Sequence, residues 1–219
     1  MKTLIVTGTD TGLGKTVVCA MLMLALDAYY WKPIQSGIAD GTDTERVAAL
    51  TGLSAERFLP ERYILSQPLS PHRAAELDGL AIAPETLDLP DIPAGRWLIV
   101  EGAGGALVPI SRTQLQTALF SRWRAPAIVV ARTALGTINH TLLTIEALQR
   151  RAIGIAGLIF VGDAIPDTER TIVELGGVKR LGRLPRLPNL NAASLHRAFD
   201  EGFARSDFEA LVSEAVHGA

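Results

Sequence analysis

The sequence predicts an α/β fold with one mostly parallel sheet and helices on both faces. Short β-branched apolar runs alternate with stretches of helical periodicity, which is typical of repeated βα units. The first apolar run leads directly into a glycine-rich turn and a helical pattern. The chain has 219 residues, of which 48% are hydrophobic, enough for one well-buried domain. We therefore expect a single domain over residues 1–219.

The elements are expected in strict alternation. Apolar runs predict strands at residues 4–7, 28–33, 97–101, 127–131, 157–161 and 181–184. Helical patterns predict helices near residues 15–27, 43–51, 113–122, 137–151, 167–175 and 206–216, with N-caps at Thr42 or Asp43, Thr113, Thr137 and Ser206. Ligands of such a sheet bind at the carboxyl ends of its strands.

The first strand leads into residues 8–16, Gly-Thr-Asp-Thr-Gly-Leu-Gly-Lys-Thr, and then into a helix. This order of parts cradles nucleotide phosphates, because backbone N–H groups of the turn and of the helix N-terminus face the anion. Lys15 would neutralise the β- and γ-phosphates, and the Thr16 hydroxyl would bind Mg²⁺. The predicted nucleotide-binding residues of this segment are Asp10, Thr11, Gly12, Leu13, Gly14, Lys15, Thr16 and Val17.

The loop departs from the strict phosphate-binding pattern at one position. That pattern needs a glycine five places before Gly14, where this chain has Thr9, and the nearest glycine is Gly8. The alternative interpretation is an ordinary βα turn, with glycines present for positive φ.

The second strand ends in Trp-Lys-Pro-Ile-Gln-Ser-Gly, so Lys32 would emerge at the same sheet edge as the phosphate-binding loop. Its helix-to-strand connection is short, because the aromatic run 29–31 follows soon after Leu26. A lysine after a strand is usually a solvated loop charge, but Pro33 and Gly37 shape a rigid turn here. We expect Lys32 and Lys15 to meet one ligand.

A third strand, at residues 97–101, delivers Glu101 to the same edge, followed by a glycine-rich turn. Glu101 is a candidate magnesium ligand or base, and Asp43 is the second carboxylate candidate. Each has a structural alternative: Glu101 could cap the following turn, and Asp43 could be the N-cap of its helix.

Composition points to small-molecule partners. There are 21 basic and 23 acidic residues and a net charge of −2, and no basic stripe indicates a nucleic-acid or anionic membrane surface. No apolar stretch reaches about 18 residues and no basic leader precedes the first strand, so a cytoplasmic location is expected. The single cysteine, Cys19, is interpreted as a small buried hydrophobe of the first helix, with a reactive thiol as the alternative.

These segments together resemble the dethiobiotin synthetases, which have the P-loop nucleoside triphosphate hydrolase fold. The resemblance runs in order from residue 3 to about residue 160, and more faintly to Pro185. It is carried by Gly8-Thr9-Asp10-Thr11 with Gly14-Lys15-Thr16, Lys32-Pro33 with Ser36-Gly37, Ser70-Pro71-His72, Glu101-Gly102-Ala103-Gly104-Gly105, and Leu135-Gly136 with Ile138-Asn139-His140.

The resemblance implies a homodimeric, ATP- and Mg²⁺-dependent cyclo-ligase of biotin biosynthesis. Its partners would be ATP, CO₂ or bicarbonate, and 7,8-diaminononanoate, whose two adjacent amines are closed into the ureido ring of dethiobiotin. One amine would form a carbamate, and the carbamate would attack the γ-phosphate to give a mixed carbamic-phosphoric anhydride. The second amine would then close the ring and expel phosphate.

The resemblance also implies roles for individual residues. Lys15 and Lys32 would supply positive charge, and Thr11 and Ser36 would contact phosphoryl or carbamate oxygens. Metal binding falls to Thr16, Asp43 and Glu101; nucleotide contacts extend to Glu101 and Gly104; and substrate contacts fall to Lys32, Ser36, Gly102, Ala103, Gly104, Gly105 and Asn139. Asn139 would reach the substrate from the partner subunit, although a local capping role is the alternative. His72 and His140 are not assigned roles.

Two departures from the family pattern affect what can be expected. Family members carry an adenine-reading Asn after the strand at residues 157–161, and here that place falls on Val161 or Gly162, which leaves the nucleotide preference open. The connection between the first helix and Lys32 is also shorter than in other members.

Three other functional classes share parts of this motif pattern. Another phosphate-loop ligase, such as a cobyrinate diamide synthase-like protein, would need a glutamine-hydrolysing domain for which this chain is too short. A partitioning or targeting ATPase would place a signature lysine early in the loop, and residues 8–11 contain none. A noncatalytic nucleotide-binding homologue is compatible with the same motifs.

Overall fold

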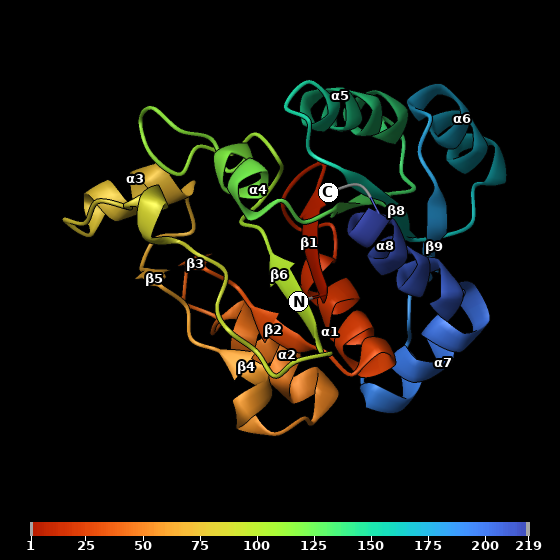
Figure 1. Cartoon of the computed structure of the whole chain (residues 1–219), viewed down its shortest axis with the longest axis horizontal. Helices are drawn as coiled ribbons and strands as arrows, with labels where there is room; N and C mark the ends of the chain where they lie inside the picture. The colour runs from red at the N-terminus through yellow and green to blue at the C-terminus, as the bar shows by residue number, and fades with distance from the viewer. Residues whose placement is uncertain (1, 218–219) are drawn as a thin grey trace.

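A seven-stranded parallel sheet organises the chain, in the order β4-β2-β6-β1-β7-β8-β9 (Figure 1). The computed structural model describes residues 2–217. The strands of this sheet are β1 (Lys2–Gly8), β2 (Tyr29–Trp31), β4 (Phe58–Leu59), β6 (Trp97–Glu101), β7 (Ala127–Arg132), β8 (Ile155–Val161) and β9 (Arg180–Leu184). A separate parallel pair joins β3 (Ile34–Ser36) to β5 (Tyr63–Leu65). The predicted fold class is confirmed.

Helices cover both faces of the sheet. One face carries α1 (Lys15–Leu26), α2 (Asp43–Thr51), α7 (Ala192–Gly202) and α8 (Arg205–His217). The other carries α3 (Pro71–Leu77), α4 (Thr117–Trp123), α5 (Thr137–Gln149) and α6 (Pro166–Gly176). Two short 3₁₀ turns, Ala55–Arg57 and Pro84–Thr86, lie in the connections. Within the described residues, no helix is long and apolar enough to cross a membrane.

The sheet is apolar on both faces because helices bury both. In β1, Leu4 and Val6 pack into the core under α1, whereas Ile5 between them packs into the opposite core. This alternation follows from the two-residue period of a strand. Buried parallel strands therefore have continuous apolar sequences, which is why they were recognisable.

The register of the three central strands brings their carboxyl ends together. Val6 of β1 pairs with Glu101 of β6, and Trp31 of β2 pairs with Val100 of β6. Lys32, the next residue after Trp31, therefore lies beside Glu101, and both lie next to the loop that follows β1. The sheet thus positions three separate segments at one edge.

The short connection from α1 to β2 is confirmed. Asp27 ends α1 in the left-handed region at φ 52°, and its N–H donates to the Met23 carbonyl. The Asp27 carboxylate forms ion pairs with Arg57, at 2.5 Å, and with Arg96. The turn is therefore held from two other segments of the chain.

Several predicted boundaries were wrong. The strand expected over residues 28–33 ends at Trp31, and a separate strand begins at Ile34. Thr113 is not an N-cap: the Ser111 hydroxyl accepts the N–H groups of Thr113 and Gln114 in a turn, and α4 begins at Thr117.

Two further N-caps were also misplaced. Thr137 is the first residue of α5 after Gly136, which lies at φ 92°, and Ser206 lies inside α8, which begins at Arg205. Helix α7 was not predicted, although Asn191 and Ser194 form a capping box at its start.

Candidate active site

A cavity of about 680 Å³ lies along the carboxyl edge of the central strands. Most of the polar groups predicted for the site line it, and they come from segments far apart in the sequence. The lining residues are Thr11, Gly12, Gly14, Lys15, Thr16, Val17, Lys32, Ser36, Asp43, Arg46, Pro68, Leu69, Ser70, Pro71, Glu101, Ala103, Gly104 and Val108.

The phosphate-binding loop has the backbone conformation that its glycines permit. Gly12 and Gly14 lie at φ 69° and 95°, and Gly14 is the N-cap of α1. Thr9 has no positive φ, and its N–H donates to the Val130 carbonyl at 3.2 Å. The position of Thr9 therefore does not require glycine, which explains the departure from the strict pattern. Leu13 is buried under the loop and does not line the cavity.

Lys15 lies at the base of this loop with its ammonium turned onto the loop itself. Its Nζ donates a hydrogen bond of 2.8 Å to the Asp10 carbonyl. Burial lowers the pKa of Lys15, and the negative charge of Glu101 opposes that shift. Asp10 is exposed at the outer side of the loop, where its carboxylate accepts the Thr11 N–H at 2.7 Å and pairs with Arg132 at 3.3 Å.

Three oxygen-bearing side chains meet at the start of α1. The Thr16 hydroxyl lies 3.0 Å from Asp43 Oδ1 and 3.0 Å from Glu101 Oε1. A hydroxyl and two carboxylates are the oxygen ligands that Mg²⁺ prefers. Thr42, not Asp43, caps α2, because its side chain accepts the Glu45 N–H in a capping box. The N-cap alternative for Asp43 is therefore wrong, and the carboxylate of Asp43 lines the cavity.

Lys32 lies between the same two carboxylates. Its Nζ is 2.5 Å from Asp43 Oδ2 and 3.2 Å from Glu101 Oε1, and the residue is 4% exposed. Burial alone would lower the pKa of Lys32, but Glu101 and Asp43 outweigh it and raise that pKa. Burial alone would raise the pKa of Asp43, but the charge and the hydrogen bond of Lys32 outweigh burial and lower that pKa. Lys32 is thus a buried cation of the site and not a solvated loop charge.

Ser36 lines the cavity, and its neighbour Gln35 holds the surrounding backbone in place. The Ser36 hydroxyl is buried, lines the cavity and has no hydrogen-bond partner among the described residues. Gln35 fixes the backbone around it: its Nε2 donates to the Gly37 carbonyl at 2.8 Å, and its Oε1 accepts the Asp43 N–H at 3.2 Å. A fixed hydroxyl without a protein partner is suited to a polar ligand atom.

The turn after Glu101 also contributes to the wall of the cavity, but only part of the turn lines it. Ala103 and Gly104 line the cavity, whereas Gly102 and Gly105 do not. Gly104 lies at φ 66°, and a Cβ there would be 3.0 Å from Val108 and 3.3 Å from the Thr11 hydroxyl. The turn can therefore approach the phosphate-binding loop closely only because this residue has no side chain.

Three further residues around the site were not predicted. The Tyr30 hydroxyl donates to Glu101 Oε2 at 2.8 Å, and the Gln116 amide binds the turn at Ala103 and Gly105. Arg46, on α2, brings a guanidinium to the lining. The aromatic run at 29–31 was a visible signal for Tyr30, whereas the sequence around Gln116 contains no comparable signal.

The predicted substrate residue Asn139 does not line the cavity, and neither do His72, His140 and Cys19, which were assigned no role in the site. Asn139 is exposed in the first turn of α5, four residues after the fully exposed Leu135. His72 Nδ1 lies 3.0 Å from the Ser70 hydroxyl, and His140 is exposed. Cys19 is fully buried, and burial raises its pKa well above the usual value, so the hydrophobic interpretation of this residue is supported.

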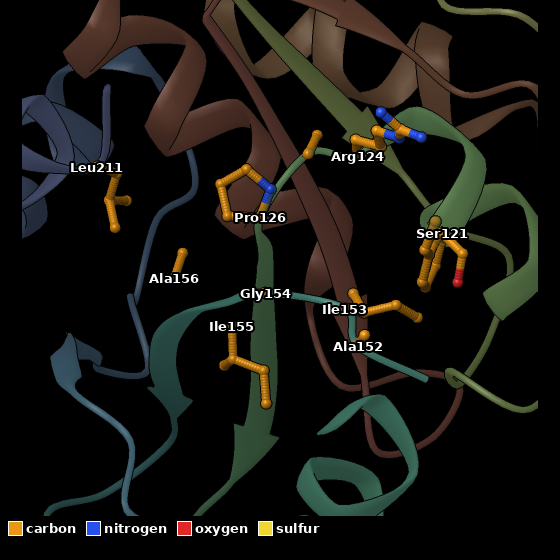
Figure 2. Close-up of a pocket in the computed structure, with 11 residues that line it drawn as sticks. Ser121, Arg124, Pro126, Ala152, Ile153, Gly154, Ile155, Ala156 and Leu211 are labelled. Carbon is orange, nitrogen blue, oxygen red and sulfur yellow. The ribbon is translucent and has the colours of Figure 1, made fainter. Parts of the chain in front are cut away.

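A second hollow, of about 350 Å³, opens at the opposite edge of the sheet (Figure 2). It lies around the segments that precede β7 and β8, and its lining includes Arg124, Pro126, Ile153 and Ile155. Most of its lining is apolar or backbone, with Arg124 and Ser121 as the polar side chains. It holds none of the predicted site residues.

Comparison with known proteins narrows the chemistry of the first cavity. A family described as an AAA domain matches residues 2–194. The ATP-dependent dethiobiotin synthetase BioD of Novosphingobium aromaticivorans is 54% identical over 208 residues, which cover 95% of this chain and 100% of the relative. That of Rhodopseudomonas palustris strain HaA2 is 55% identical over 207 residues, 94% of this chain and 96% of the relative.

Solved structures confirm the type of fold. The septum site-determining protein MinD complexed with Mg-ADP, from Pyrococcus horikoshii, matches with a TM-score of 0.53 and 13% identity, covering 98% of this chain and 95% of that one. At this identity the match supports the P-loop type of fold and no particular activity.

Proposed function

Because the chain belongs to the ATP-dependent dethiobiotin synthetase family of biotin-biosynthetic ligases, we propose that it joins CO₂ to 7,8-diaminononanoate and closes the ureido ring of dethiobiotin. One geometric observation supports this most directly: Lys32 and Thr16 each contact both Asp43 and Glu101, directly beside the phosphate-binding loop. Such a cluster can neutralise a phosphoryl group and an acceptor anion at the same place.

The proposed reaction has three steps. One amine of the substrate attacks CO₂, forms an N–C bond and loses a proton to solvent, which gives a carbamate. A carbamate oxygen attacks the γ-phosphorus of ATP, the bond to the bridging oxygen breaks, and ADP leaves. The second amine attacks the carbonyl carbon of the resulting anhydride. Phosphate leaves with the electron pair of the broken C–O bond, and the attacking amine loses a proton to water.

The side chains of this site would position and neutralise charge. Lys32 retains its proton at neutral pH because neighbouring carboxylates raise its pKa, so it acts as a cation and not as a base. Lys15 would release the Asp10 carbonyl and contact the β- and γ-phosphates. Thr11 and Ser36 line the cavity and would donate hydrogen bonds to phosphoryl or carbamate oxygens.

The residues present fit a magnesium ion. Thr16, Asp43 and Glu101 would hold it, and Mg²⁺ when bound with the nucleotide would neutralise charge on the phosphoryl oxygens.

Nucleotide selection by hydrogen bonding is proposed to rest on backbone groups around residues 182–185, at the end of β9. The side chains of Val161 and Gly162 offer no amide, and the Gly162 carbonyl already accepts a hydrogen bond of 2.9 Å from Arg183. We therefore expect weaker discrimination between nucleoside triphosphates than a side-chain amide would provide.

We further propose that each subunit is a single domain and that two subunits form a homodimer. Leu135, just before α5, is fully exposed, Leu143 within α5 is also exposed, and Asn139 lies between them in the sequence. We interpret this segment as a contact surface for the second subunit. In a dimer, Asn139 would reach the substrate of the partner subunit.

The decisive experiment supplies 7,8-diaminononanoate, bicarbonate, Mg²⁺ and each nucleoside triphosphate in turn. Formation of dethiobiotin with one equivalent of phosphate is the expected result. Nucleotide hydrolysis without dethiobiotin would overturn the proposal and favour an ATPase switch. Neither product nor hydrolysis would favour a noncatalytic nucleotide-binding protein.

A further inference from the structure

Gln116 connects helix α4 to the turn that follows Glu101. It is the last residue before α4 and is 2% exposed. Its side chain does not cap the helix. Instead, the side-chain oxygen Oε1 accepts the Ala103 N–H at 2.6 Å, and the side-chain nitrogen Nε2 donates to the Gly105 carbonyl at 3.3 Å. Both partners belong to the turn.

The backbone of Gln116 adds a third attachment. Its N–H donates to the Val108 carbonyl at 2.8 Å, so one residue holds the segment from Ala103 to Val108 at three points. Helix α4 is itself anchored in the core by Leu119, Phe120 and Trp123. The position of the turn is therefore tied to the core through Gln116.

The attached segment forms part of the wall of the cavity. Ala103, Gly104 and Val108 line the cavity, whereas Gln116 does not. The amide of Gln116 lies so close to Gly102 that a Cβ there would be 2.8 Å from Nε2. The turn and the Gln116 side chain are therefore in close contact. A change in this side chain must either move the turn or leave the Ala103 N–H and the Gly105 carbonyl without their partner.

We propose that Gln116 is a positioning residue that sets the distance between this wall and the phosphate-binding loop, and thereby the affinity for the acceptor diamine. The proposal rests on the function proposed above. Gln116 contacts the turn, whose residues 102–105 are all predicted to contact the acceptor and of which only Gly104 is also predicted to contact the nucleotide, so its effect should be larger for the acceptor than for ATP. Binding and catalytic groups have to be held within about 0.5 Å of their productive positions, so a displaced wall should weaken binding of the acceptor.

The test compares Gln116→Met with Gln116→Glu and with Phe120→Leu as a control that weakens α4 packing without touching the turn. Met has a similar length but cannot make either hydrogen bond. Gln116→Met should raise KM for the diamine about tenfold and leave KM for ATP within about twofold. It should also speed hydrogen exchange of the Ala103 amide. Phe120→Leu should lower stability while both KM values stay near those of the unsubstituted enzyme.

Gln116→Glu provides a pH signature. A carboxylate still accepts the Ala103 N–H but repels the Gly105 carbonyl, whereas a protonated carboxyl group donates to that carbonyl and restores both bonds. The ratio of its diamine KM to that of the unsubstituted enzyme should therefore fall toward one as pH decreases. A merely structural role would give a ratio independent of pH.

The measurements distinguish failure of the proposed function from failure of the role proposed for Gln116. No dethiobiotin from the unsubstituted protein would overturn the proposed function and this inference with it. Product formation with an unchanged diamine KM in Gln116→Met, or with equal increases in the KM for diamine and ATP, would overturn the inference alone.

Discussion

The Tyr30 hydroxyl donates a hydrogen bond of 2.8 Å to Oε2 of Glu101, and both side chains are buried. The other carboxylate oxygen of Glu101 lies 3.0 Å from the Thr16 hydroxyl and 3.2 Å from Lys32 Nζ. Burial, with the charge of Glu101 added, raises the pKa of Tyr30 well above its usual value. The phenol therefore remains a donor at neutral pH and fixes the orientation of Glu101.

Tyr30→Phe should destabilise the protein by about 1–3 kcal/mol, because a buried carboxylate oxygen loses its hydrogen-bond partner. The same change should raise the Mg²⁺ concentration needed for half-maximal turnover, since Glu101 is no longer held in place. Urea unfolding and a Mg²⁺ titration of dethiobiotin formation measure the two effects. Tyr63→Phe removes a hydroxyl that accepts the Ala83 N–H elsewhere, and is the matched control. An equal Mg²⁺ shift in both variants would contradict the assignment.

Lys32→Ala should lower kcat by about 100-fold or more, because the acceptor and phosphoryl oxygens lose a preorganised cation. Lys15→Ala should be at least as damaging. Steady-state turnover with saturating diamine and ATP measures both changes, and folding is checked by circular dichroism. Lys179→Ala removes an exposed lysine that pairs with Asp207 and should leave turnover unchanged. Unchanged turnover in Lys32→Ala would remove this residue from the reaction.

The sequence predicted the site best where chemistry leaves a local signature. The phosphate-binding loop, Lys32 and Glu101 each follow an apolar strand, and parallel strands bring such residues to one edge. Tyr30 and Gln116 were missed: the aromatic run at 29–31 marks a buried strand but does not show that the Tyr30 hydroxyl meets Glu101, 71 residues away, and nothing near Gln116 shows that its side chain binds Ala103. Helix α7 was missed although its start carries a local signal, the capping box formed by Asn191 and Ser194.

Short elements were missed for a different reason. β3 and β5 have three residues each, too few for a hydrophobic period, and they exist because they pair with each other. Thr113 was mistaken for a helix start because hydroxyl side chains cap turns as readily as helices.

Leu135→Asp should dissociate the proposed dimer, because a carboxylate would replace an apolar side chain in the contact. Sedimentation velocity should show a dimer for the unsubstituted protein and a monomer for the variant, with diamine turnover lost in parallel. Leu175→Asp, on α6, changes another exposed leucine and is the control. A monomeric unsubstituted protein with full turnover would refute the dimer.

Glu76→Gln should lower the melting temperature at neutral pH by an amount that disappears in acid. Arg112 contacts both Glu76 oxygens, at 2.5 and 2.6 Å, and with Arg73 it lowers the pKa of Glu76 from 4.5 to about 2. A carboxyl group with a lowered folded-state pKa stabilises the protein above its unfolded pKa and loses that effect as pH falls through the folded value. Melting curves of both proteins should therefore converge between pH 4.5 and about 2.

High salt should also reduce the difference, because these side chains are exposed. Glu146→Gln, whose ion pair with Arg150 spans 3.7 Å, is the control and should show a smaller difference at neutral pH. A melting-temperature difference for Glu76→Gln that persists at pH 2 would contradict the assignment.

The order of strands has a consequence for how the chain acquires its site during synthesis. β6 lies between β1 and β2, although it follows both in the sequence by more than sixty residues. The first two strands to be synthesised, β1 and β2, therefore lack the strand that pairs with both of them until residue 101 has been added. Because Lys32 and Thr16 meet at Glu101, the last residue of β6, we expect the nucleotide site to form only after β6 has been made. Truncation before β6 should leave a fragment with exposed strand edges, the kind of species that chaperones retain.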